Sequence, residues 1–324
     1  MARIVIDKHR NCLYTRSTSD HISVVYLGPA GDMFTPITTL TAICKSAQVL
    51  CPGTPSLDIR NFSIAHLQPT LPNESKNVHL VAITSTGCRL YFTHSRMGYN
   101  GYSYSSSRSG EPSGLHLMHV RPPPPSLRDP LEEESARHAA RFNAFASAQQ
   151  LALITPKPLI ITEVPTAYYT SGFMVSAISS GQVNASDTLL CTSIDLGKIS
   201  ASPSQAGVTQ NPSYSNISSY GGNAYGTNAP RHALVEFASL LPVTGKAWAV
   251  AEIPRPSLPR HPPALPHPNA LNELASQFSE PLHSLLLLTN QGLTKIVKQR
   301  PVDCLKELLS AEDAVGQVRK FVEK

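Results

Sequence analysis

Charged residues are scarce in this chain, and so are the features that identify a membrane-spanning or nucleic-acid-binding protein. Asp, Glu, Lys and Arg make up 15% of the 324 residues, there is one tryptophan, and the net charge is +5. The basic residues are scattered without a Lys/Arg run, so specific nucleic-acid binding is not indicated. No apolar run approaches the roughly 20 residues that a membrane-spanning helix requires.

Cysteine usage does not indicate a disulfide framework or a zinc site. The chain has no C-x-x-C motif and no signal-peptide pattern at its N-terminus, so we expect reduced thiols in a cytosolic or nuclear compartment. The six cysteines are Cys12, Cys44, Cys51, Cys88, Cys191 and Cys304.

Motifs that carry catalytic or cofactor chemistry are also missing. The chain has no G-x-S-x-G elbow, no phosphate-binding loop, no G-x-G-x-x-G and no H-E-x-x-H. His261 and His267 lie in a proline-rich stretch, where a metal site is the less favoured interpretation. The acidic run 132–134 is most simply the solvated start of a helix. We therefore expect no enzyme activity, no catalytic residues, no cofactor and no metal.

What the chain does contain is a long series of short apolar segments. They are rich in Val, Ile, Leu and Tyr and are bounded by Gly, Ser, Asn and Pro, which favours strands over helices. The sequence therefore predicts a mainly β fold. The candidate strands are 3–7, 12–16, 21–27, 62–68, two strands within 79–93, 115–120, 158–164, 172–178, 188–194, 232–241, 246–253, 284–289 and 293–297.

Three low-complexity inserts, 97–114, 199–230 and 254–268, interrupt this series and are predicted to be long loops. Two other segments, 39–50 and 131–152, fit helices better than strands. The second of these helices allows two interpretations. A surface helix packed across a sheet edge is favoured over a weak helix in a membrane interface.

An internal repeat indicates the architecture. Residues 80–87 and 285–292 share the template apolar-x-x-apolar-Thr-x-x-Gly, ending at Gly87 and Gly292, and a second strand follows each copy. Repeated strand–turn–strand units without intervening helices indicate a β-propeller, whose blades are four-stranded sheets. The candidate strands suffice for about three blades. The sequence thus predicts a partial propeller over residues 1–298.

The stretch 84–87 within the repeat could be either a chemical site or a corner between two strands. Gly87 can adopt a positive φ, and the hydroxyls of Thr84 and its neighbours can bond nearby backbone groups, so a corner is the better interpretation. Arg89 faces the other side of its strand from Cys88 and Leu90. Two alternatives stay open for Arg89, an ion pair with a neighbouring blade or a contact with a partner protein.

The pattern becomes helical from residue 299 to residue 324. Pro301 follows Arg300 near a helix start, and Asp303 lies in the first turn, where an acidic side chain is favourable. A second helix is predicted after the capping pattern of Ser310 and Asp313. We expect the start of an α-helical region here.

Four blocks of this sequence resemble the large scaffold nucleoporins of the nuclear pore inner ring. The blocks are residues 3–28, 79–93 (HLVAITSTGCRLYFT), 117–124 (LMHVRPPP) and 285–309 (LLLLTNQGLTKIVKQRPVDCLKELL). The resemblance implies the late blades of an N-terminal β-propeller followed by the first helices of an α-solenoid. On this resemblance, the structural signature residues are Thr84, Gly87, Arg89, Gly292, Arg300, Pro301 and Asp303.

The resemblance also implies a function. The expected role is a structural constituent of the nuclear pore complex at the nuclear envelope, supporting protein import and RNA export. Expected partners are other inner-ring scaffold and linker nucleoporins, with membrane contact made through the full-length protein. The rival interpretations are a propeller-plus-solenoid adaptor of a vesicle coat and an enzyme built on a propeller. Neither WD-type repeats nor a cluster of acids or histidines supports these rivals.

Overall fold

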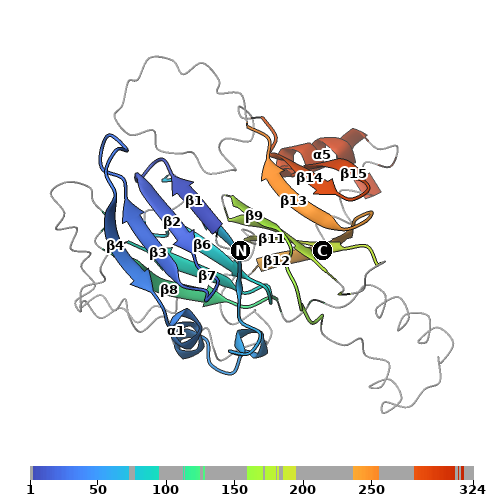
Figure 1. The fold of residues 1–324 in the computed structure, drawn as a ribbon. Coiled ribbons are helices and arrows are strands. Elements are labelled where there is room, and N and C mark those ends of the chain that lie inside the picture. The colour runs from blue at the N-terminus through green and yellow to red at the C-terminus, as the bar shows by residue number, and fades with distance from the viewer. Residues whose placement is uncertain are drawn as a thin grey trace, which may run out of the picture. The chain divides into compact units, whose positions relative to one another are not determined.

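The fold is mainly β and was obtained as a computed structural model (Figure 1). The structure describes residues 3–72, 77–94, 112, 114–124, 127, 159–170, 172–179, 181, 185–194, 236–254, 281–310, 313 and 315–316. They form two compact units, Met1–Lys246 and Ala247–Lys324.

The first sheet of the first unit is a four-stranded antiparallel meander in the order β1-β2-β3-β4. In β3 the buried side chains of Ile22, Val24 and Tyr26 alternate with half-buried ones, as expected for a strand with one fully covered face. The four strands are β1 Arg3–Asp7, β2 Cys12–Arg16, β3 Ile22–Tyr26 and β4 Thr35–Leu40.

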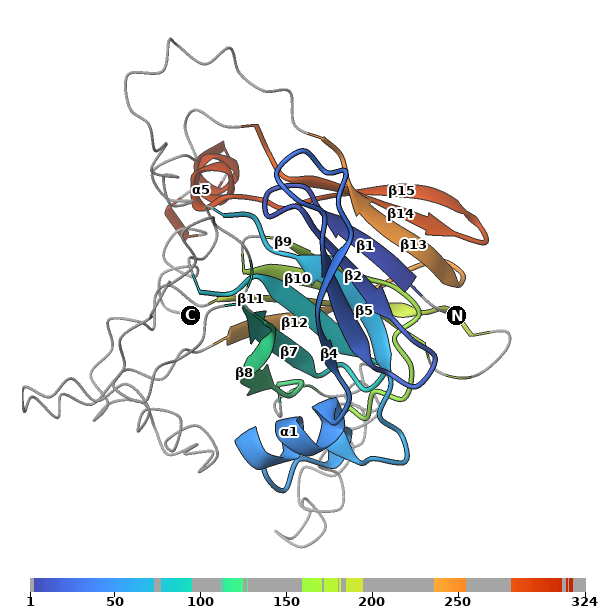
Figure 2. The same cartoon turned by 60° about the vertical axis from the view of Figure 1, so that its left-hand side comes forward.

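Two further four-stranded meanders follow in the same unit. The second sheet consists of β5 Ile64–Pro69, β6 Leu80–Thr84, β7 Arg89–Thr93 and β8 His116–Arg121. The third consists of β9 Ala167–Thr170, β10 Phe173–Ile178, β11 Thr188–Ile194 and β12 Glu236–Pro242. The first strand of each sheet contacts the first strand of the next, since β1 packs beside β5 and β5 beside β9. Sheets that meet through their first strands in this serial way are arranged as the blades of a propeller (Figure 2).

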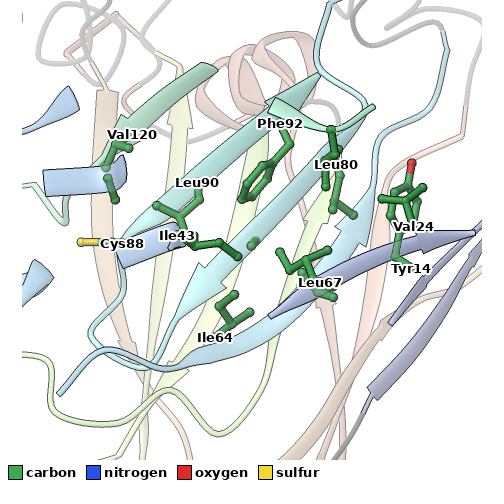
Figure 3. Packing of buried hydrophobic residues seen from close by; sticks show 14 of the residues in the cluster. Tyr14, Val24, Ile43, Ile64, Leu67, Leu80, Cys88, Leu90, Phe92 and Val120 are labelled. Carbon is green, nitrogen blue, oxygen red and sulfur yellow. The ribbon is translucent and has the colours of Figure 1, made fainter. Parts of the chain in front are cut away.

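The second sheet lies between the other two and is buried on both faces. All five residues of β6 are buried, whereas β3 alternates between buried and half-buried positions. One core, shared with the first sheet, contains Tyr14, Leu67, Leu90 and Phe92 (Figure 3). The other, shared with the third sheet, contains Val81, Ile83, Met174 and Leu190. Each fully buried side chain of this size contributes about 1.5–3 kcal/mol, so these two cores are what join the sheets.

A short helix, α1 (Ile43–Leu50), and the 3-10 turn η1 (Pro55–Leu57) connect the first two sheets. Ile43 and Ala47 on one face of α1 are buried in the first core, and the helix packs beside β8. The sequence predicted this helix over 39–50, and it begins at Ile43 because the preceding residues pair in β4.

The second unit contains a three-stranded antiparallel meander, β13 Ala247–Glu252, β14 Ser284–Thr289 and β15 Gly292–Val297. The β14–β15 hairpin turns at 290–291, and Gly292 at its end has a φ of 151°. The helix α5, Pro301–Ser310, follows the sheet, and residues 315–316 are also helical.

The structure corrects the expected number of blades and two strand assignments. It contains four propeller-like sheets in the described residues rather than about three. Strands β4 and β9 were not expected, whereas the candidate strand at 158–164 contributes, in its described residues, only an isolated bridge between Glu163 and Ser179. The prolines at 158 and 165 explain the second difference, because proline cannot donate to a ladder.

Several other predictions lie outside the described residues. These are the predicted helix at 131–152, nearly all of the inserts 97–114, 199–230 and 254–268, and most of the predicted second helix after Ser310. The predicted boundary at residue 298 lies inside the second unit, between β15 and α5.

Candidate functional site

The corner between β6 and β7 is held by hydrogen bonds to its own backbone and to the segment after η1. The amide of Cys88 donates to the Thr84 hydroxyl at 2.9 Å, and the Gly87 amide donates to the Thr84 carbonyl at 3.0 Å. The Ser85 amide reaches the Ser63 carbonyl at 2.8 Å, and the Ser85 hydroxyl donates to the Asn61 carbonyl at 3.1 Å. These contacts use the polar groups of the corner structurally, as turn chemistry requires.

Gly87 combines a positive φ with a close approach. Its φ is 78°, a region that favours glycine, and a Cβ built on it would lie 2.8 Å from Cδ1 of Ile161 and 3.2 Å from Cγ of Pro123. The corner therefore packs directly against the segment that leads into the third sheet. A larger residue at this position would both strain the backbone and push the segment away.

Arg89, at the start of β7, forms a bidentate ion pair with Glu236, at the start of β12. Its two terminal nitrogens lie 2.6 Å from the two carboxylate oxygens of Glu236. One terminal nitrogen also lies 3.4 Å from the Thr192 hydroxyl on β11. The pair thus joins the second sheet to the third, which is the first of the two alternatives that the sequence left open for Arg89.

Arg121 completes this inter-sheet ion cluster, which we define as Arg89, Arg121 and Glu236. The register places Arg89 directly opposite Arg121 in the β7–β8 ladder, where like charges repel. A terminal nitrogen of Arg121 lies 2.6 Å from Oε1 of Glu236. The Glu236 carboxylate therefore pairs with both guanidinium groups and offsets the repulsion between them. The side chain of Arg89 is 2% exposed and that of Glu236 is 13% exposed. In such a dry setting, removing one partner leaves a buried, uncompensated charge.

The two arginines of the cluster lower the pKa of Glu236 and of the nearby His119. Burial alone would raise the pKa of Glu236, but hydrogen bonds and charge from Arg89 and Arg121 outweigh burial and bring it below its ordinary value. Burial, together with the charges of Arg121 and Arg89, lowers the pKa of His119 to about 4. A neutral His119 can accept the hydrogen bond from Nε of Arg121, at 3.2 Å.

A second polar cluster lies between the first two sheets. The Tyr14 hydroxyl on β2 lies 2.6 Å from Nε2 of His94, just after β7, and the other ring nitrogen of His94 contacts the Gly114 carbonyl. His79 stacks on His94 with ring centroids 5.3 Å apart and accepts the His94 amide at 2.8 Å. Burial lowers the pKa of His94, so its neutral ring can accept a hydrogen bond from the Tyr14 hydroxyl at Nε2.

The start of α5 is closed by an ion pair over one turn. Nε of Arg300 lies 2.6 Å from one carboxylate oxygen of Asp303, and a terminal nitrogen lies 3.0 Å from the other. The Arg300 amide also donates to Asp303 at 3.2 Å, which satisfies one of the free amides at a helix start. Pro301 is the first residue of this helix, where its missing N–H costs nothing.

The described residues contain no group of three or more His, Cys, Asp or Glu that could hold a metal ion. In the same part of the chain, no helix is long and apolar enough to cross a membrane. Cys12 and Cys88 are buried, and burial raises the pKa of each thiol to about 12. Such thiols stay protonated at neutral pH and are poor nucleophiles.

Sequence reasoning singled out Arg89 but missed Arg121, Glu236, Tyr14 and His94. One signal was available for Glu236, an acid inside the apolar run 232–241, because a charge in a buried strand needs a partner. No signal in the sequence showed which arginine it would meet.

Serial four-stranded meanders, joined by apolar cores and by a buried ion cluster, define a β-propeller-like fold. The chain belongs to the nucleoporin family described as Nup133 N terminal like, whose family model matches residues 1–295. Nucleoporins are the proteins of the nuclear pore complex, so the expected family and its location at the nuclear envelope are confirmed.

Two similar proteins were found, one by sequence and one by structure. The chain is 28% identical over 334 aligned positions to the Schizosaccharomyces pombe protein named "Probable nucleoporin C890.06", covering 99% of this chain and 23% of that protein. It also matches the crystal structure of the Chaetomium thermophilum Nup170 NTD–Nup53 complex with a TM-score of 0.63, at 21% identity and covering 100% of this chain. The chain spans 40% of that solved chain. At this identity the second likeness shows the fold alone, whereas the family match favours the nucleoporin over the vesicle-coat adaptor.

Proposed function

We propose that this chain is a non-catalytic part of the inner-ring scaffold of the nuclear pore complex. In this role it supports protein import and RNA export by building and anchoring the pore. The observation that carries the proposal is the family match over residues 1–295, on a body whose sheets are joined by buried contacts. Such a body is suited to holding surfaces at fixed spacing.

The proposed domain plan is a late portion of a propeller over 1–298 and the start of an α-solenoid over 299–324. Support for the first part comes from β1, whose Ile4 and Ile6 are 65% and 56% exposed on the face turned away from the core. An apolar face of this kind suits a further sheet packed against it. Support for the second part comes from α5, which has exposed leucines, Leu305 and Leu309, one turn apart. The structural signature residues retain their proposed role as markers of this plan.

The proposed partners are other nucleoporins, both scaffold and linker proteins. The solved neighbour was crystallised as a Nup170 NTD–Nup53 complex, which supports a nucleoporin partner for this chain as well. Contact with the nuclear-envelope membrane is proposed to be made through the full-length protein.

The test is to tag the endogenous locus with a fluorescent protein, image living cells and blot the same lysate. A punctate nuclear rim is the expected result. A Golgi-like or cytoplasmic punctate signal would replace the nucleoporin role with that of a coat adaptor. The blot checks that the fluorescent signal comes from an intact fusion rather than from free tag.

A further inference from the structure

Within the part of the chain that the structure describes, strand β15 is an open sheet edge. It pairs with β14 on one side, and among the described strands nothing pairs with its other side. Five of its six residues are exposed, including Leu293 at 63% and Val297 at 40%. The last strand of the third sheet, β12, has four of its seven residues at least partly buried. An exposed edge with apolar side chains is a template for another strand.

The register of the hairpin shows which backbone groups are free. Thr289 pairs with Gly292 across the turn, and the Lys298 amide donates to the His283 carbonyl at 2.9 Å six positions further along. Hydrogen-bonded and non-bonded pairs alternate in an antiparallel ladder. Residues 292, 294, 296 and 298 therefore bond to β14. The N–H and C=O groups of Leu293, Lys295 and Val297 point to the open side.

Lys295 selects what can pair with this edge. Its side chain is exposed, lies on the same face as Leu293 and Val297, and has no ion-pair partner among the described residues. A second copy of β15, pairing antiparallel with Leu293 opposite Val297, would place two Lys295 side chains directly opposite each other. Like charges in that position are destabilising, which disfavours self-association at this edge. An acidic side chain in the same position would instead be attracted.

We propose that β15 is the docking edge for an extended peptide segment of a partner protein, which adds to the sheet as a fourth strand. The segment carries the pattern apolar-x-acidic-x-apolar, with its acid opposite Lys295 and its apolar residues opposite Leu293 and Val297. This pattern fits in either chain direction, because it is symmetric about the acid. Strand addition derives affinity from main-chain hydrogen bonds and specificity from alternate side chains. The inference rests on the proposed function, since it names how a partner nucleoporin would be held.

The test measures binding of a fluorescein-labelled peptide with the core Val-Thr-Glu-Thr-Val to the full 324-residue chain by fluorescence anisotropy. A matched peptide with Lys in place of Glu should bind roughly tenfold more weakly. Lys295→Glu should reverse this preference between the two peptides. Val297→Pro removes an outward N–H that β14 does not use and should abolish binding, whereas Val297→Ala, the side-chain control, should only weaken it.

Hydrogen exchange supplies a readout of the geometry. Without peptide, the amides of Leu293, Lys295 and Val297 should exchange fast and those of Thr294 and Ile296 slowly, and the peptide should protect the first three. Equal binding of both peptides, or no binding, would overturn the inference. So would protection of all five amides before peptide is added, or a dimer of the parent chain that Val297→Pro dissociates. A nuclear rim that persists in cells carrying Lys295→Glu would show that the proposed function stands even if the docking edge fails.

Discussion

Arg89 and Glu236 are 147 residues apart in the chain, yet their side chains share two hydrogen bonds of 2.6 Å. The pair crosses from the second sheet to the third and also separates Arg89 from the like charge of Arg121. The ion pair adds a directional contact between the two sheets, beside a cluster of buried apolar side chains.

Replacing the acid should therefore be costly. Glu236→Gln keeps the size of the side chain but leaves two buried guanidinium groups without their carboxylate. We expect the free energy of unfolding to fall by about 3 kcal/mol, measured by urea denaturation. Asp58→Asn in the same unit, where the carboxylate pairs with the exposed Arg60, serves as a control and should cost much less. Equal losses at the two positions would contradict a special role for the inter-sheet cluster.

Gly87→Ala should destabilise the first unit by about 2 kcal/mol, through strain at a positive φ and through the clash with Ile161. Gly181→Ala is the matched control, because Gly181 has a φ of +73° but no atom within 4 Å of the added Cβ. It should cost about 1 kcal/mol, from strain alone. Thermal unfolding of both variants measures the difference, and a difference of zero would show that the corner does not press on Ile161.

Tyr14→Phe should cost about 1–2 kcal/mol, because it leaves Nε2 of buried His94 without its hydrogen-bond donor. Tyr26→Phe, in the same core but without a described hydrogen bond from its hydroxyl, is the control and should be nearly neutral. The urea denaturation midpoints of the two variants measure the difference. An unchanged midpoint for Tyr14→Phe would contradict a stabilising role for the Tyr14–His94 hydrogen bond.

Stability should fall on mild acidification. The folded-state pKa of His119 is lowered to about 4 and that of His94 is also lowered, so both histidines are neutral in the folded protein while the unfolded chain still binds their protons near pH 6.5. Above pH 6.5 these two histidines do not lower the free energy of unfolding, because they are neutral in both states. As the pH falls toward 4, the unfolded chain binds protons that the folded protein does not, so the free energy of unfolding falls. The expected slope is up to about 1.4 kcal/mol per pH unit for each histidine. Glu236, whose pKa is lowered in the folded protein, adds to the loss of stability once the pH falls below the ordinary pKa of a glutamate.

Urea denaturation at several pH values measures this slope. A His119→Asn variant should show a shallower slope between pH 6.5 and 4 than the parent chain. An identical slope would mean that His119 is not kept neutral by burial and by its arginine neighbours.

Local sequence patterns predicted most of the strands, but they could not predict which residues from distant parts of the chain pair with one another. Alternation in β3 and the apolar run of β6 identified strands, because a strand's faces can be seen from its own residues. Strand β4 was missed because Pro36 lowers its strand signal, and β9 because it has only four residues. The expected number of sheets was also low because it assumed four strands in every sheet, whereas the sheet β13-β14-β15 has three described strands.

The candidate site was predictable to a smaller extent. The corner at Gly87 follows from local turn chemistry, and so does the start of α5 at Arg300 and Asp303. The partner of Arg89 depends instead on how two sheets pack, and Glu236 follows a long insert that carries no periodic signal. The open edge of β15 could be identified only from the strand order and register of the sheet, which the sequence alone does not give.

The most direct test of a scaffold role is how long the protein stays in the pore. Photobleaching one half of the nuclear rim in cells with the tagged endogenous locus measures this residence. A built-in scaffold component should leave the bleached half dark while the unbleached half stays bright, because exchange requires disassembly of buried interfaces. Rapid recovery of the bleached half, or the absence of a rim signal, would contradict the account.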